Sequence, residues 1–139
     1  MLSLASLEVI EKTKELLTAQ IGGKKVDVGV GLLRETDINK IAKPLCLIAL
    51  VLTEFVPETA AGKIVRETDT IEIYAVAKTH ADKNSLLENI ANTILNASPF
   101  DLTSGQHQGL YLVSIDWLLE EGLPLYVGRL VLKSVTILP

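Results

Sequence analysis

Few residues in this chain have the types and spacing that catalysis requires. Neither His80 nor His107 has a second ligand at a metal-binding spacing such as H-E-x-x-H, so we expect both to be solvated loop residues. Asp101, Ser104 and His107 are the residue types of a hydrolytic triad, but they share one short loop that lacks a nucleophile elbow. We therefore predict that the protein is not an enzyme and has no catalytic or metal-binding residues.

Two further patterns match functional motifs only in part. The segment Val26–Arg34 begins like a dinucleotide-binding fingerprint, but Arg34 occupies the position of the third glycine. We predict no cofactor, and we interpret Gly29 and Gly31 as positions where another backbone approaches closely or where the strand bulges. The single cysteine, Cys46, lies inside an apolar run and is predicted to be a buried, inert thiol.

Length and composition indicate a single domain that spans residues 1–139. Hydrophobic residues make up 48% of the chain and aromatic residues only 4%, so the apolar content is aliphatic. Such an excess is typical of buried β-strands and of oligomer interfaces. The longest apolar run, Leu45–Leu52, is shorter than the roughly 18 to 20 residues that cross a bilayer, which favours a core strand over a membrane span.

The net charge and the N-terminal sequence limit the binding partners and the cellular location that we expect. The chain has 13 Lys and Arg against 17 Asp and Glu, which gives a net charge of -4. An acidic chain gains nothing from the counterion release that drives general nucleic-acid binding, so we predict no direct nucleic-acid partner. The start Met1-Leu-Ser-Leu-Ala lacks the basic region and cleavage site of a signal peptide, which indicates a cytoplasmic protein.

Hydrophobic periodicity predicts two helices and several strands. One helix begins with a cap at Ser3 and ends at Gly22, and a second begins with a cap at Asp82 and ends before Pro99. Strands are predicted at Val26–Leu32, Leu45–Phe55 and Thr70–Lys78. A buried helix is the alternative for the second of these runs. Helices and strands that do not alternate strictly along the chain indicate an α+β fold, with helices packed on one face of a mainly antiparallel sheet.

The longest β-type sequence, Leu110–Leu138, predicts a terminal hairpin that reverses at Glu121-Gly-Leu-Pro124. The even-numbered face of its first strand mixes leucines such as Leu112 with polar residues and should be a subunit contact. On this reading Trp117→Ala unfolds the protein, whereas Leu112→Glu leaves a folded monomer that cannot assemble. The odd-numbered residues are apolar and should form the core face: Tyr111, Val113, Ile115, Trp117 and Leu119.

Two connections differ in composition from the elements that they join. Pro57–Gly62 and Ser98–Gly109 are polar and contain Gly or Pro. Binding surfaces concentrate on such loops. We therefore expect both to project from the sheet as contact elements.

The second half of the chain has a recognisable order of elements. Ile71-Glu-Ile-Tyr-Ala-Val-Ala is followed by His80-Ala-Asp82, by a helix that contains Leu86, Leu87, Ile90 and Ile94, and then by Gly109-Leu-Tyr-Leu-Val-Ser-Ile-Asp-Trp. This order resembles that of the tail terminator proteins of long-tailed bacteriophages and of their relatives in prophage, tailocin and contractile-injection clusters. An N-terminal helix and two earlier strands fit the same order, so the resemblance covers nearly the whole chain. It carries no residue motif and no site residue.

The resemblance implies a structural subunit of a phage tail or tail-like particle. Such a subunit forms a homo-oligomeric ring, usually a hexamer, that caps the tail tube and presents a surface to head-completion or neck proteins. The implied partners are further copies and the tail tube protein, without a membrane, in the host cytoplasm during assembly and later in the virion tail. A related neck or baseplate protein is one alternative. A small α+β ligand-binding or enzymatic dimer is another, and it would need a concave pocket with converging polar groups.

Overall fold

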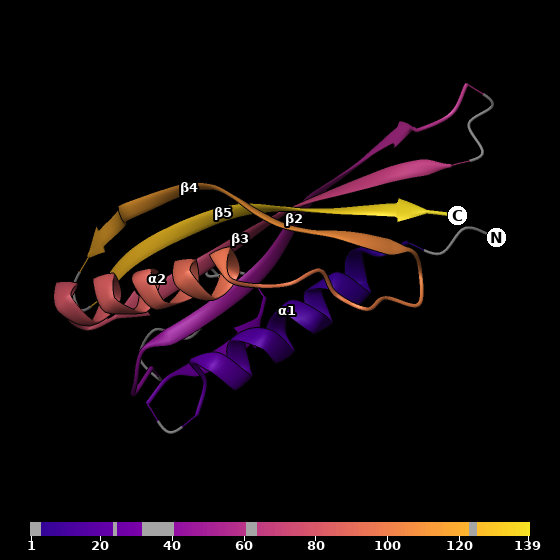
Figure 1. Cartoon of the computed structure of the whole chain (residues 1–139). Coiled ribbons are helices and arrows are strands. Elements are labelled where there is room, and N and C mark those ends of the chain that lie inside the picture. Colours follow the sequence, from indigo (N-terminus) through magenta and orange to yellow (C-terminus); the bar gives the residue numbers. More distant parts are fainter. Residues whose placement is uncertain (1–3, 24, 32–40, 61–63, 123–124) are drawn as a thin grey trace.

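A computed structural model describes residues 4–23, 25–31, 41–60, 64–122 and 125–139, with only the backbone described for 119–122. The elements are α1 (Ser6–Gln20), β1 (Asp27–Val30), β2 (Leu45–Pro57), β3 (Val65–Ala77), α2 (His80–Leu95), β4 (Gln106–Gly122) and β5 (Leu125–Leu138). Both helices lie on the same side of a mostly antiparallel sheet (Figure 1). The α+β class with helices on one face is therefore confirmed.

The strands of this sheet are ordered β1-β2-β3-β5-β4 in the described residues. β1 pairs with β2 in parallel, and the other neighbouring strands are antiparallel. The strand prediction for Leu45–Phe55 is confirmed over its helical alternative, and the hairpin of β4 and β5 is confirmed as well. Two residues of the predicted reversal, Leu123 and Pro124, lie outside the described residues.

The helix starts differ from those expected. Thr79, not Asp82, caps α2, because the Thr79 side chain accepts a hydrogen bond from the Asp82 backbone N–H at 3.1 Å. Asp82 instead lies in the first turn, where its negative charge is favourable beside the positive end of the helix dipole. α1 begins at Ser6, and Ser3 lies outside the described residues. Neither helix is long and apolar enough to cross a membrane, within the described ranges.

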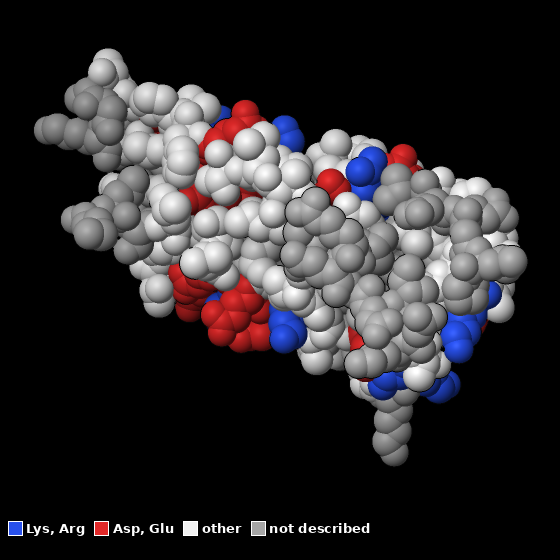
Figure 2. Space-filling view, turned by 180° about the vertical axis from the view of Figure 1, so that it is seen from behind, with Lys and Arg blue, Asp and Glu red and all other residues white. Residues whose placement is uncertain are grey.

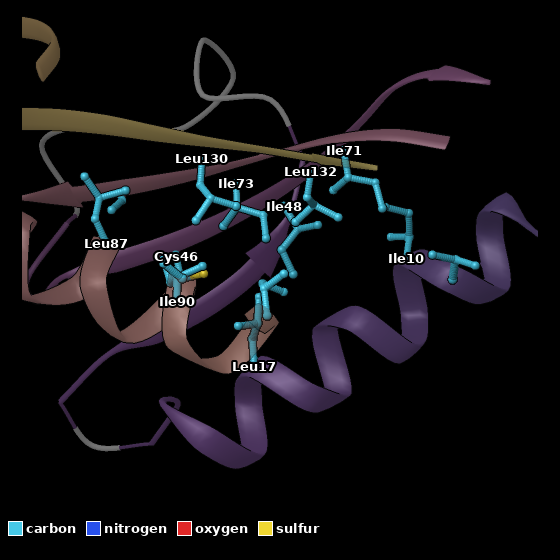
Figure 3. Close-up of a cluster of buried hydrophobic side chains, with 14 of the residues drawn as sticks. Ile10, Leu17, Cys46, Ile48, Ile71, Ile73, Leu87, Ile90, Leu130 and Leu132 are labelled. Carbon is cyan, nitrogen blue, oxygen red and sulfur yellow. The ribbon is translucent and has the colours of Figure 1, made fainter. Parts of the chain in front are cut away.

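The core fills the space between the two helices and the sheet. Figure 3 shows side chains from α1 and α2 pointing towards those of β2, β3 and β5. The buried residues of the core include Val9, Ile10, Leu17, Cys46, Ile48, Ile71, Ile73, Leu87, Ile90, Ile94, Leu130 and Leu132. Burial raises the pKa of the Cys46 thiol to about 12, so the prediction of a buried, unreactive cysteine is confirmed.

The core face predicted for the first strand of the hairpin is correct at Ile115 and wrong at Tyr111, Val113 and Trp117, and the side chain of Leu119 lies outside the described residues. Tyr111, Val113 and Trp117 are 52%, 54% and 49% exposed. Leu112, assigned to a subunit contact, instead packs against the core together with Ile115. The consequences predicted for Trp117→Ala and Leu112→Glu are therefore reversed.

Irregular pairing explains why simple alternation fails in β4. The register against β5 shifts between His107 and Gly109, and again between Leu112 and Ser114. Each shift adds a residue on β4 that has no partner and changes which parity faces the helices. Gly109 has a φ of +134°, a conformation that favours glycine and that accompanies the first shift.

Gly29, in β1, and Gly31, just after β1, were both expected to mark a close backbone approach or a bulge, and Gly29 marks neither. A Cβ on Gly29 would meet only Leu47 Cδ1, at 3.8 Å, and Gly29 pairs in regular register with Leu47. Neither close backbone approach nor a bulge therefore explains Gly29. Gly31 has a φ of +150°, which disfavours any other residue.

Candidate assembly surface

The outer half of β2 is an edge strand in the described part of the chain. β1 pairs with β2 only from Leu45 to Ile48, whereas β3 pairs with it as far as Pro57. We call Val51–Pro57 the β2 edge. In Figure 1 this end of β2 and β3 runs past the helices to a turn that points away from the body. The expectation that the connection after Pro57 projects agrees with this view for its described residues, 57–60.

The β2 edge exposes large apolar side chains on both faces of the sheet. Val51, Leu52, Phe55 and Val56 are each about half exposed. The register shifts between Leu50 and Leu52, so Leu52 and Val56 lie on the face away from the helices and Phe55 lies on the helix side. An exposed apolar edge strand is a place where a strand of another chain can pair.

The opposite edge of the sheet, β4, has the same character. Tyr111, Val113, Trp117 and Leu118 are about half exposed. When two different edges of one subunit pair with each other, the contact between copies is head-to-tail, and such contacts close into a ring when the rotation permits.

A charged network lies on the sheet face that the helices leave uncovered. Arg129 Nη2 donates to Asp116 Oδ2 at 2.6 Å, and Arg129 Nη1 lies 3.5 Å from Glu72 Oε2. The hydroxyl of Tyr74 donates to the same Glu72 oxygen at 3.0 Å. Hydrogen bonding to Asp116 raises the pKa of Arg129 above its ordinary value. The network fixes the strand register of β3, β5 and β4 on this face.

A buried lysine joins α2 to the edge strand β4. The side chain of Lys83 is 1% exposed, and its Nζ donates to the backbone carbonyl of Trp117. Desolvation lowers the pKa of Lys83. This hydrogen bond between the Lys83 ammonium group and a backbone carbonyl of β4 links α2 to β4 in addition to apolar packing.

The Ser98–Gly109 connection does not project from the sheet, and that expectation is wrong. Phe100 and Leu102 pack against the core, and from Gln106 the chain is already part of β4. The apolar side chains within this segment account for its packed position. We therefore exclude it from the candidate assembly surface.

The same connection is attached to the first turn of α1 by Glu8. The Glu8 carboxylate accepts hydrogen bonds from the backbone N–H groups of Thr103, at 2.9 Å, and Ser104, at 3.2 Å. The Ser104 hydroxyl also donates to Glu8 at 2.7 Å. These bonds, led by the Thr103 N–H, lower the pKa of Glu8 from 4.5 to about 2.

We expect Glu8→Gln to lower the melting temperature at pH 7, because the amide replaces an ionised acceptor that receives several hydrogen bonds. The folded-state pKa is depressed, so this stabilisation is present above pH 4.5 and is lost as the pH falls towards about 2. Melting curves between pH 2 and pH 7 should therefore show the two proteins converging at the acidic end. Glu11→Gln, at an exposed position of the same helix, is the control and should melt like the native protein at every pH.

A layer of buried polar side chains lies beside the start of α1. It crosses four strands and consists of the half-buried Thr53 and of the buried residues Glu67, Asp69, His107, Ser134 and Thr136. His107 is 5% exposed, so the expectation of a solvated loop histidine is wrong for it. His80 is exposed, as expected, but it is the first residue of α2 and not a loop residue, and its ring centroid lies 4.0 Å from that of Tyr126. Periodicity did not reveal this layer because its members are polar.

Asp101, Ser104 and His107, the residue types of a hydrolytic triad, are not hydrogen-bonded to one another in the structure. His107 Nε2 is 2.8 Å from Ser134 Oγ, whereas Ser104 bonds to Glu8 and Asp101 is exposed. No group of three His, Cys, Asp or Glu side chains in the described residues is placed to hold a metal ion.

A groove of about 680 Å³ lies between the C-terminal end of α1 and α2. Its lining is Gln20, Ile21, Lys25, Val26, Pro44, Asp82, Ser85, Leu86, Asn89, Asn92 and Thr93. Aliphatic, amide, hydroxyl and two charged side chains line it, and the described groups whose pKa is shifted lie elsewhere. The apolar edges, not this groove, are therefore our candidate functional surface.

Comparisons with known proteins agree with the fold. No protein-family model and no curated protein matches the chain. Among solved structures, a chain in the virion of a native gene transfer agent particle is similar, with a TM-score of 0.60 and 12% identity. The likeness covers 92% of this chain and 91% of that chain. It shows that the two chains share one fold over nearly their whole lengths.

Proposed function

We propose that the protein is a structural, non-enzymatic subunit of a phage-like particle. The observation that carries the proposal is the fold shared with a chain of the gene transfer agent virion, because the likeness leaves little of either chain unmatched. Within that particle we assign it the role of tail terminator, on the element order that resembles this family. It would act as a homo-oligomeric, hexameric ring that caps the tail tube and meets the head-completion proteins, assembling in the host cytoplasm and remaining in the virion tail.

The exposed edges support a subunit that completes its surface by assembly. A β2 edge and a β4 edge that both expose apolar side chains favour head-to-tail contacts between copies. The net charge of -4, to which acidic and basic side chains such as those on the face in Figure 2 contribute, is compatible with DNA passing through such a ring without binding to it. No membrane or cofactor is needed for this role.

The decisive experiment is electron microscopy of particles made without this protein. Because a terminator stops the addition of tube subunits, the expected result is tail tubes of uncontrolled length without heads. Adding the purified protein should cap them and restore head joining. Tubes of normal, uniform length would rule out the terminator role.

A label fused to the protein separates the terminator from its relatives in the same particle. A terminator is labelled where the tube meets the head. Label at the far end of the tail would instead indicate a baseplate protein, and an unlabelled particle would contradict a structural role altogether.

A further inference from the structure

Two acidic side chains, Glu67 and Asp69, are buried together on the helix-facing side of β3 with no exposed surface. They are two residues apart on one strand, so they point to the same face. The Ala5 backbone N–H donates to Glu67 Oε1 at 3.0 Å, and Thr53 Oγ1 donates to Asp69 Oδ1 at 2.7 Å. The other two carboxyl oxygens, Glu67 Oε2 and Asp69 Oδ2, have no hydrogen-bond partner. Two ionised carboxylates in this arrangement would repel each other and leave two buried acceptors unpaired.

The histidine of the same layer does not supply a compensating charge. The Phe100 backbone N–H donates to His107 Nδ1 at 2.8 Å, so Nδ1 carries no proton. His107 Nε2 is 2.8 Å from Ser134 Oγ and, as the protonated nitrogen of a neutral ring, donates to it. Burial lowers the pKa of His107 more than the charge of Asp69 raises it. The geometry therefore fixes a neutral imidazole.

The other elements that pack here bring uncharged groups to the acidic pair. β2 contributes Thr53, and β5 contributes Ser134 and Thr136, which lie opposite Asp69 and Glu67 in the register. α1 contributes the backbone N–H of Ala5. The charged side chains in the first half of α1 are engaged elsewhere or exposed: Glu8 binds the connection before β4, Lys12 pairs with Glu15, and Glu11 and Lys14 face solvent.

We propose that Glu67 and Asp69 share one proton in the folded protein at mildly acidic pH, and that this proton is a pH-sensitive latch that holds the start of α1 on β3. A proton on Glu67 Oε2 lets that atom donate to Asp69 Oδ2, so a single hydrogen bond gives both unpaired oxygens a partner. Glu67 Oε1 remains free to accept the Ala5 N–H. Because Glu67 lies opposite Phe55 in the register, the latch joins the N-terminal helix to the strand pair that carries the β2 edge.

The direction of the pH dependence follows from the proton that folding takes up. Burial, together with hydrogen bonding to Asp69, raises the pKa of Glu67 from 4.5 to about 7. In the unfolded chain this carboxyl ionises near 4.5, so between pH 4.5 and about 7 the folded state binds the extra proton. The stabilisation of the folded state by this proton is complete below that window and is lost as the pH rises through it. Above the window the latch is open.

The first test is thermal unfolding of the full chain between pH 4.5 and 8.5. The native protein should lose melting temperature across the window, whereas Glu67→Gln should show a flatter profile and melt higher than the native protein at pH 8. The amide of glutamine can donate to Asp69 Oδ2 without a titratable proton. Glu54→Gln, an exposed acid on the β2 edge, is the matched control and should keep the native profile. A Glu67→Gln profile parallel to the native one overturns the proposal.

The second test uses the native protein, so it does not depend on the folding of a variant. Carbon-detected NMR of the side-chain carboxyl of Glu67 should give a titration midpoint well above its unfolded value of 4.5. Hydrogen exchange at pH 8 should show the first turn of α1 less protected in the native protein than in Glu67→Gln. A midpoint at the ordinary value, or equal protection in the two proteins, excludes a shared proton that holds α1.

Discussion

Leu132→Ala is expected to destabilise the protein by about 2 to 5 kcal/mol, because Leu132 has no exposed surface and lies in the core between the helices and the sheet. A domain is typically stable by about 5 to 15 kcal/mol, so this single change would remove a large share of the stability. Urea unfolding followed by circular dichroism measures it. The midpoint should shift to lower urea while the slope stays constant, which separates a loss of stability from a change in the unfolded state.

The two faces of β4 provide the control. Leu112 lies opposite Leu132 in the register, so Leu112→Glu should also destabilise strongly by placing a carboxylate against the core. Trp117→Ala should cost about 1 kcal/mol or less, because half of that side chain is already in solvent. Unfolding by Trp117→Ala together with tolerance of Leu112→Glu would contradict the faces that we assign.

The double variant Leu52→Lys, Val56→Lys is expected to abolish assembly and leave the subunit folded. Both side chains are about half exposed on one face of the β2 edge, so their replacement removes little core packing. Lysine on an edge strand opposes pairing with another strand, and two central contacts of an interface can each contribute about 2 kcal/mol. We therefore expect binding to tail tubes to weaken by at least about 100-fold, measured by co-sedimentation, with a melting temperature close to that of the native protein.

Leu95→Lys is the matched control for that experiment. Leu95 is exposed to a similar degree but ends α2, where a positive charge is favourable beside the helix C-terminus. It should melt and assemble like the native protein. Equal loss of assembly in both variants would indicate a general effect of added charge and would remove the β2 edge from the interface.

The sequence was sufficient to predict the elements that follow a regular period. The spacing of Leu86, Leu87, Ile90 and Ile94 correctly indicated the buried stripe of α2. Unbroken apolar sequence at Leu45–Leu52 correctly indicated a strand. Helical and extended backbones repeat their side-chain directions at fixed intervals, so such patterns are readable without coordinates.

Sequence reasoning failed where the period is broken or where polar groups are buried. The register shifts in β4 move Leu112 to the core, and nothing in the residue types except Gly109 signals them. Glu67 and Asp69 lie before the strand predicted at Thr70–Lys78, and their burial depends on partners at the start of α1 and in β2 that no sequence period reveals. The β2 edge was missed for a related reason: exposure of an apolar strand depends on which strands lie beside it.

The position of β5 between β3 and β4 has a consequence for synthesis of the chain on the ribosome. β5 is made after the other strands that the structure describes, yet it pairs with β3 from Val65 to Ala77 on one side and with β4 on the other. Until it emerges, β3 has only β2 beside it, and the buried residues of the sheet cannot meet their partners from Leu130 and Leu132. The pairing of β3 with β5 joins residues that are distant in sequence and is therefore slow to form, whereas β4 and β5 form a local hairpin. A nascent chain therefore cannot complete the sheet described here until β5 has been translated, and β3 has an unpaired edge until then.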